Sequence, residues 1–432
     1  MMDDGRERTA RTASPVAELV LDTLNGRLSR REILRRSAAL GLAAPMVAAM
    51  LKVAPVAGAQ GTPAAPPPSG EPVVIGCPYN LTGSYASIDG PASQGSLLAA
   101  KELSASGGIL GRPVELRIYD GKSDQTTVSN VVTRLIEEDE VPALVGLTDT
   151  GYFLAGGPIA QEAGVPFLDV AGTAPIITEL GDYIFMLPFG DNVQAAAAAE
   201  FAQEKGWTTC ALLFDADTDY TTFLAEYFKE RYTDDEIQGE LLDERSYPSG
   251  ETDFSSPLTE IKNLDPQPAF VYIASNPAEI GIIVKQARDL GIELPIMGGD
   301  GYDTSLLVQL AGEATREVYF TTHQGIYGDD PIAKNFNAAY EAEYGNPPEV
   351  VFAALGYDGI KLMADAINRA GSLEGEEIRD ALAATQGFQG ASGTISYEPG
   401  SRIPSKSVVI IQVVDQINTP LAVVIPREIP EA

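Results

Sequence analysis

Residues 114–147 read VELRIYDGKSDQTTVSNVVTRLIEEDEVPALVGL. Two short apolar segments, at residues 114–119 and 143–147, enclose a segment whose apolar residues recur at the three- and four-residue spacing of a helix. These apolar residues are Val128, Val131, Val132, Leu135 and Ile136. We therefore predict a strand, a helix over residues 125–138 and a second strand, which is the unit from which parallel sheets are built.

The same alternation extends over most of the chain in two successive series. In the first series the predicted strands are at residues 73–79, 114–119, 143–147 and 166–170, with helices at 91–104, 125–138 and 154–163. In the second the predicted strands are at 209–214, 239–246, 269–274 and 295–298, with helices at 195–205, 223–232, 254–263 and 278–290. We therefore predict an α/β fold with two doubly wound lobes, each binding ligands at the carboxyl ends of its strands.

The remaining part of the chain returns to strands after a helical section. We predict a strand at 318–322, helical structure over 331–384, and short closing strands at 393–397 and 407–414. A tail that resumes strands after two complete series indicates that the chain crosses between the lobes more than once.

The composition narrows the classes of function. The chain carries 61 acidic against 29 basic residues, a formal net charge of −32, which repels nucleic acid and anionic lipid. It contains one histidine, His323, and two cysteines, Cys77 and Cys210. Zinc sites and histidine-based triads usually need more, and the motifs of nucleophile elbows and phosphate loops are missing from the sequence. We therefore expect no enzyme, no catalytic residues, no metal and no cofactor.

The N-terminal segment has the features of an export signal. Residues 29–36 read SRREILRR and precede an apolar run of about 15 residues, short for a membrane span of about 20. The pair Arg30 and Arg31 resembles a twin-arginine signal, and small residues at 56–59 fit a signal-peptidase site. We predict a signal segment at 1–59 and a Pro/Ala-rich linker at 60–72. An uncleaved, membrane-tethering anchor and a basic amphipathic helix of a cytoplasmic protein stay open as alternatives.

Several motifs resemble those of the periplasmic binding proteins of branched-chain amino-acid ABC transporters. In chain order they are NLTG at 80–83, GGILGR at 107–112, GVP at 164–166, DFS at 253–255, PIMGGDG at 295–301 and ALGYDG at 354–359. The resemblance covers residues 73–414 and implies a type I periplasmic binding fold, with two Rossmann-like lobes joined by three crossovers. We expect the first lobe at 73–191 plus 321–392 and the second at 192–320 plus 393–432.

The resemblance also implies which residues bind the ligand. Thr150 matches a hydroxyl that binds the α-carboxylate of an amino acid, while the backbone near Ala171 and the Thr173 hydroxyl hold carboxylate and ammonium. Tyr220 fits a tyrosine that closes over the ligand from the second lobe, and Asp300 fits an acidic residue that pairs with the ammonium. Each has a structural alternative: Thr150 as a helix N-cap, Thr173 as a turn residue, and Asp300 as a turn or cap residue.

The side-chain pocket departs from the family pattern. Tyr85, Ile88, Tyr152 and Asn276 are the candidates for lining it. Asn276 and the nearby Asp89 make this pocket more polar than a leucine site needs, because a buried amide costs free energy unless it is paired. The ligand is therefore a branched-chain or related amino acid, or alternatively a small amide, urea or an aromatic acid.

The resemblance implies a receptor outside the cytoplasm. The expected function is capture of an amino acid between the lobes and delivery to an ABC permease in the membrane, by a monomer in the periplasm. A receptor that senses the same ligand without transport would use the same fold and site, so this alternative stays open.

Overall fold

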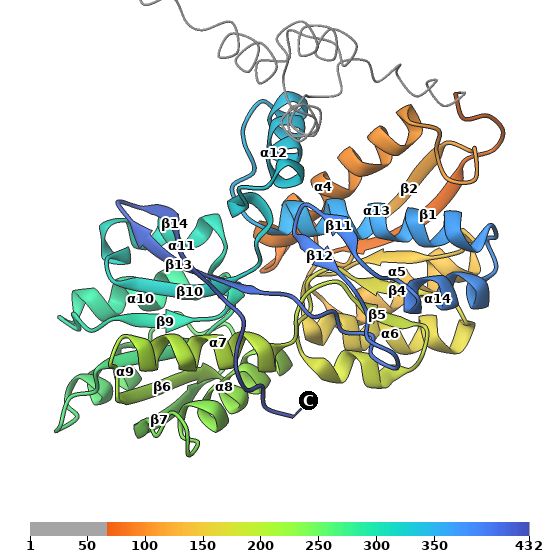
Figure 1. Cartoon of the computed structure of the whole chain (residues 1–432). Coiled ribbons are helices and arrows are strands. Elements are labelled where there is room, and N and C mark those ends of the chain that lie inside the picture. The colour runs from red at the N-terminus through yellow and green to blue at the C-terminus, as the bar shows by residue number, and fades with distance from the viewer. Residues whose placement is uncertain (1–66, 432) are drawn as a thin grey trace, which may run out of the picture. The chain divides into compact units, whose positions relative to one another are not determined.

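The computed structural model describes residues 67–431, which form one compact unit (Figure 1). The expected signal segment at 1–59, and the expected linker as far as residue 66, lie outside the described residues. Within residues 67–431, every helix is too short or too polar to cross a bilayer.

The first lobe contains a five-stranded parallel sheet with the strand order β2-β1-β3-β4-β5. Its strands are β1 (Val73–Tyr79), β2 (Val114–Asp120), β3 (Leu144–Gly146), β4 (Phe167–Asp169) and β5 (Ile184–Met186). Its helices are α4 (Ala86–Ala105), α5 (Gln125–Glu137), α6 (Thr150–Ala163), α13 (Phe352–Ala370) and α14 (Gly375–Ala383). In β3, Leu144 packs with α5 and α6, whereas its neighbour Val145 packs with α4 and α13, because successive strand residues face opposite sides of a sheet.

Two glycines set the distance between α4 and α13. A Cβ atom at Gly95 would lie 1.8 Å from the carbonyl oxygen of Ala353, and one at Gly356 would lie 1.9 Å from that of Ala92. The backbones of the two helices therefore touch directly, which only glycine permits. This contact joins a helix from the start of the chain to one that follows about 250 residues later (Figure 1).

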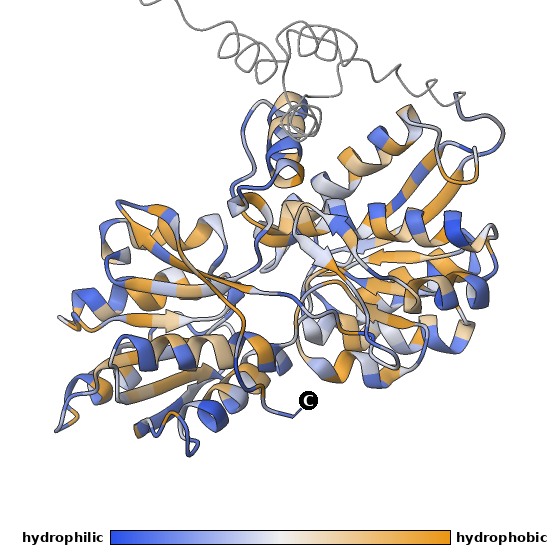
Figure 2. Cartoon of the chain, in the orientation of Figure 1, coloured by the Kyte–Doolittle hydropathy of each residue, from blue (hydrophilic) through white to orange (hydrophobic). Residues whose placement is uncertain are grey.

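The second lobe contains a seven-stranded sheet with the order β14-β13-β10-β9-β8-β6-β7. The strands are β6 (Thr209–Asp215), β7 (Glu240–Tyr247), β8 (Phe270–Ala274), β9 (Ile296–Gly298), β10 (Val318–Thr322), β13 (Val408–Val414) and β14 (Ile417–Val424). One face is covered by α7 (Asp191–Glu204) and α8 (Asp219–Tyr232), and the other by α9 (Ser255–Lys262), α10 (Ile280–Asp289) and α11 (Ser305–Ala311). Figure 2 shows the strands of both lobes as mainly hydrophobic and the outer helix faces as mainly hydrophilic, as expected for buried sheets.

Strands β13 and β14 differ from the sequence prediction. They add to the parallel sheet as antiparallel strands, and β14 lies beyond the last strand that the sequence predicts. Its sequence INTPLAVV contains Asn, Thr and Pro, which weaken the strand pattern, and Pro is confined to positions such as this edge of a sheet.

Three crossovers join the lobes, as the resemblance implies. The first lies between β5 and α7, the second between β10 and α12 (Pro331–Tyr344), and the third precedes β13 (Figure 1). The α/β class with two doubly wound lobes is therefore confirmed.

The third crossover lies later in the chain than the sequence analysis places it. Residues 393–397, expected in the second lobe, pack in the first, where β12 (Gly393–Ile395) pairs with β11 (Phe388–Gly390). The buried Tyr397 hydroxyl donates to the Met186 carbonyl at 2.8 Å, which holds this segment against β5. The boundary is thus corrected from residue 393 to the stretch just before β13. Strand β12 forms its backbone hydrogen bonds with β11 in the first lobe, and the chain crosses to the second lobe only afterwards.

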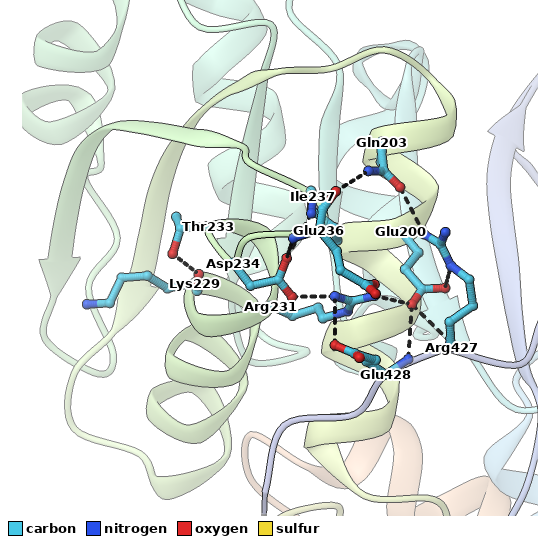
Figure 3. Close-up of polar contacts among 10 residues, drawn as sticks. All are labelled: Glu200, Gln203, Lys229, Arg231, Thr233, Asp234, Glu236, Ile237, Arg427 and Glu428. Atoms are coloured by element: carbon cyan, nitrogen blue, oxygen red, sulfur yellow. Dashed lines mark hydrogen bonds and ion pairs between the residues drawn. The ribbon is translucent and has the colours of Figure 1, made fainter.

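A buried ion cluster holds the C-terminal segment on the second lobe (Figure 3). Arg231 of α8, whose side chain is 2% exposed, donates to Glu200 of α7 at 2.7 Å and also pairs with Asp234. The same Glu200 carboxylate accepts the backbone N–H of Arg427 at 2.9 Å. Glu200 thus ties the residues after β14 to α7, and Arg231 supplies its main countercharge.

We expect Arg231→Met to lower the free energy of unfolding by up to about 3–5 kcal/mol, because it leaves the buried Glu200 with only the more exposed Arg427 as a countercharge. Adding Glu200→Met should recover part of the loss, since the unpaired charge is then removed. Lys229→Met, on the same helix as Arg231, breaks an exposed ion pair with Glu244 of β7 and should cost at most about 1 kcal/mol. Urea denaturation of the three variants and the unmodified protein measures this; equal losses for Arg231→Met and Lys229→Met would contradict it.

Candidate functional site

The carboxyl ends of strands from both lobes meet at one narrow cavity, whose free volume is about 10 Å³. This is the edge where ligands bind in open α/β sheets, next to the point where the strand order reverses between β1 and β3. The residues that line the cavity are Tyr85, Ile88, Thr148, Asp149, Thr150, Ala171, Gly172, Thr173, Tyr220, Pro277, Asp300, Gly301 and Phe352.

The loop after β3 brings a hydroxyl to the cavity. Asp149, not Thr150, is the N-cap of α6, because its carboxylate accepts the backbone N–H of Tyr152 at 3.1 Å. Thr150 is the first residue of the helix, and its Oγ1 accepts the Ala174 N–H at 3.2 Å. The Thr150 hydroxyl proton therefore stays available to an anion in the cavity.

The loop after β4 is joined to the start of α7 in the second lobe. The Thr173 carbonyl accepts the backbone N–H of Asp191 at 2.7 Å. Burial raises the pKa of the Asp191 carboxyl well above its usual value, and the charge of Asp300 raises it further. The Thr173 hydroxyl acts in the opposite direction and lowers the same pKa. Burial and the charge of Asp300 therefore both disfavour the charged form of this carboxyl.

Asp300 begins a short 3₁₀ turn, η2 (Asp300–Tyr302), directly after β9, and is 2% exposed. Its Oδ1 accepts two hydrogen bonds, from Gln194 Nε2 at 2.9 Å and from the Tyr220 hydroxyl at 3.0 Å. Its Oδ2 lies 3.4 Å from Nε2 of His323. Because burial lowers the pKa of His323, this imidazole is neutral at ordinary pH. Asp300 is therefore surrounded by neutral groups.

Gly299 and Gly301 allow Tyr220 to approach Asp300. A Cβ atom at Gly299 would lie 2.6 Å from the Tyr220 hydroxyl oxygen. That oxygen also accepts the Gly301 N–H at 2.9 Å while it donates to Asp300. The Gly-Gly-Asp-Gly sequence at 298–301 is thus a steric requirement of this arrangement.

The structure brings the five expected ligand-binding residues to one cavity: Thr150, Ala171, Thr173, Tyr220 and Asp300. Tyr85 and Ile88 line it as well, whereas Tyr152 and Asn276 line a neighbouring cavity.

The Tyr85 hydroxyl separates these two cavities, because it donates across the lobes to Asn276 Oδ1 at 2.6 Å. Asn276 Nδ2 in turn donates to Asp215 at 2.7 Å, so both ends of this amide are already paired.

Sequence reasoning missed several lining residues. Thr148 and Asp149 lie in the same loop as Thr150, so the end of the predicted strand at 143–147 could have indicated them. Phe352 and Pro277 carry no such local signal. Phe352 begins α13 after the second crossover, some 200 residues from Thr150, and reaches the cavity only through the fold.

The cavity is acidic. Asp149 and Asp300 line it, and no Lys or Arg is among its described lining residues. Behind them lies Asp89 of α4, whose Oδ2 accepts the Asn80 N–H at 2.6 Å. Burial raises the pKa of Asp89 to about 7 and that of Asp149 to about 6. A site of this kind favours a ligand with a positive charge.

Two α/β lobes that meet over a cavity at their strand ends define a two-lobed binding protein. The sequence matches the family described as periplasmic binding protein over residues 72–417, and the chain belongs to this family.

Its relatives include solute-binding proteins of known structure. It is 33% identical to a leucine-binding protein from Thermotoga maritima, with a TM-score of 0.77, over 82% of this chain and 99% of that one. It is 31% identical to a branched-chain amino acid transporter substrate-binding protein from Streptococcus pneumoniae in complex with isoleucine. The TM-score is 0.77, over 82% of this chain and 100% of that one.

A leucine-, isoleucine-, valine-, threonine- and alanine-binding protein from Pseudomonas aeruginosa is 26% identical, over 74% of this chain and 83% of its own length. The family and the type I fold implied by the sequence motifs are thus confirmed.

The raised pKa of Asp89 predicts a pH-dependent stability. The folded state holds a proton on Asp89 up to about pH 7, whereas the unfolded state loses it near 3.8. Folding therefore takes up a proton between these values, and the free energy of unfolding falls as the pH rises from about 4 to about 7. Asp89→Asn keeps an acceptor for Asn80 but cannot ionise, so it should gain stability over the unmodified protein as the pH rises.

Urea denaturation at about pH 5 and about pH 8 measures this difference, which should grow by about 2.7 kcal/mol. Asp329→Asn, at a fully exposed carboxylate, is the control and should show the same stability difference at both pH values. A gain for Asp89→Asn that is equal at both pH values would contradict the proton uptake by Asp89.

Proposed function

We propose that the protein captures an α-amino acid between its lobes as the extracytoplasmic receptor of an ABC importer. The observation that carries this proposal is the position of Asp300, a buried carboxylate held by neutral donors, in the same cavity as the hydroxyls of Thr150 and Thr173. The ligands named for the relatives from Thermotoga, Streptococcus and Pseudomonas support the same class of ligand.

An α-amino acid is a zwitterion, so its site needs an anion at one end and hydrogen-bond donors at the other. Asp300 supplies the negative end from the second lobe. The hydroxyls of Thr150 and Thr173, with the backbone around Ala171, supply the donors from the first. Charge-assisted hydrogen bonds of this kind are about twice as strong as neutral ones, which lets the site work without a buried Arg.

The two ends of the ligand site belong to different lobes, which couples binding to closure. A ligand shifts a conformational equilibrium only by its differential affinity for the two states. A zwitterion that reaches both Thr150 and Asp300 binds fully only when the lobes are closed. The closed form then binds a permease in the membrane, which is the proposed partner. The receptor itself is proposed to be a monomer without catalytic activity.

Isosteric substitution of Asp300 tests the ligand class. Asp300→Asn keeps an acceptor for Gln194 and Tyr220 but removes the charge, so a bound ammonium loses its partner. We expect a loss of affinity of about a hundredfold or more for α-amino acids, measured by calorimetry after co-purified ligand has been removed. Asp329→Asn should bind as the unmodified protein does.

Two results would contradict this assignment. Undiminished binding by Asp300→Asn would remove Asp300 from the ligand site. Binding of only amides, urea or aromatic acids would leave the receptor function in place but require a different ligand class.

Export by the twin-arginine route is the proposed origin of the periplasmic location. It rests on the sequence SRREILRR at 29–36, ahead of the apolar run and the linker at 60–72. Replacing Arg30 and Arg31 together by Lys keeps the charge but removes the pair, and should retain the protein in the cytoplasm. The matched control replaces Arg35 and Arg36 by Lys. Fractionation of cells measures both, and equal export of the two variants would reject the route.

A further inference from the structure

Two buried oxygen atoms beside the cavity have no hydrogen-bond partner. Thr148 lines the cavity and is 5% exposed, and its Oγ1 makes no hydrogen bond within residues 67–431. Asp89 is fully buried, and its Oδ1 is likewise unpaired in the described part of the chain. More than about 90% of buried polar groups in proteins have a partner, so such a pair at a ligand cavity calls for an explanation.

The two groups lie close to each other. The Thr148 hydroxyl lowers the pKa of the Asp89 carboxyl, against the larger effect of burial, which raises it. The other oxygen of Asp89 is already used, because it accepts the Asn80 N–H. A hydroxyl can donate one hydrogen bond and accept another, so Thr148 can donate to Asp89 while it accepts from a group in the cavity.

Two other polar side chains near the cavity are already paired. Tyr85 donates to Asn276, and Asn276 donates onward to Asp215, so neither offers a free group to a ligand side chain. Thr150 and Asp300 face the charged ends of the proposed amino acid. Among the residues that the structure describes, Thr148 is the one with an unpaired buried hydroxyl that lines the cavity directly, together with the apolar Ile88 and Phe352.

We propose that the cavity selects α-amino acids whose short side chain carries a hydrogen-bond donor, such as a hydroxyl, over those with a branched alkyl side chain, with Thr148 as the residue that recognises the donor. This inference rests on the proposed function, since it assigns the side-chain end of the same ligand.

The physical basis is the cost of an unpaired buried group. A branched alkyl side chain would cover Thr148 and leave the acceptor capacity of its hydroxyl unused, whereas a side chain of the same shape with a hydroxyl would donate to it. A site built to bond a ligand hydroxyl rejects the analogue that lacks it more strongly than an apolar pocket rejects an added hydroxyl. Asp89 acts as a positioning residue, because it orients the Thr148 hydroxyl.

Threonine and valine test this inference, because they have nearly the same shape and differ by a hydroxyl in place of a methyl group. We expect calorimetry on the purified protein to show threonine binding about 10- to 100-fold more tightly than valine. Thr148→Val should reduce this ratio to near one, mainly by weakening threonine. Thr148→Ser, which keeps the hydroxyl, should retain the preference, and Asp89→Asn should reduce it partly.

The possible failures are distinct. Valine binding as tightly as threonine, or a preference for threonine that survives Thr148→Val, would overturn the role of Thr148 while the amino-acid receptor stands. If no α-amino acid binds the unmodified protein, the proposed function fails and this inference fails with it. Coincident thermal unfolding of Thr148→Val and Thr148→Ser shows that both variants are folded.

Discussion

Asp300 is a buried carboxylate whose described neighbours are all neutral, and the rest of the site depends on it. Gln194 and Tyr220 donate to one of its oxygens, and the neutral His323 lies beside the other. Neutral donors stabilise a buried charge only partly, because the desolvation of an ion costs several kcal/mol. In the proposed function, the ammonium of the ligand supplies the positive charge that the described neighbours lack. The opposite lobe then needs only donors, which Thr150 and Thr173 provide.

The same carboxylate lies next to the connections between the lobes. His323 follows β10 in the second crossover and stacks on Phe189 of the first, with ring centroids 3.9 Å apart. Gln324, the next residue, donates to Ser407 of the third crossover at 3.0 Å. The three crossovers therefore contact one another, with His323 between them and Asp300. A change of charge at Asp300 therefore acts on residues of the crossovers that join the lobes. This contact could couple lobe closure to ligand binding.

The parts that were predictable from the sequence are those that repeat locally. Strands and helices alternate with clear periods, so the two lobes could be predicted, and Thr173 and Asp300 could be placed because they lie in segments that resemble motifs of the family. Phe352 and the Tyr85–Asn276 bond join residues about 200 positions apart, and no local pattern reports such a contact. The boundary at residue 393 was wrong because β12 resembles the start of a new sheet, although its partner is the preceding strand β11.

Closure itself is supported by bonds that do not involve a ligand. Tyr85 donates to Asn276, and Thr304 and Ser87 lie 3.0 Å apart between their hydroxyl oxygens, so hydroxyl and amide groups of the two lobes pair directly. Each such bond contributes about 0.5–1.5 kcal/mol net, whereas pairing a buried charge is worth several times as much. The neutral bonds therefore set how easily the lobes meet, and the charge at Asp300 decides whether they stay together. Affinity and selectivity thus have separate origins, since the ammonium drives closure and the side-chain end of the cavity discriminates among the molecules that carry one.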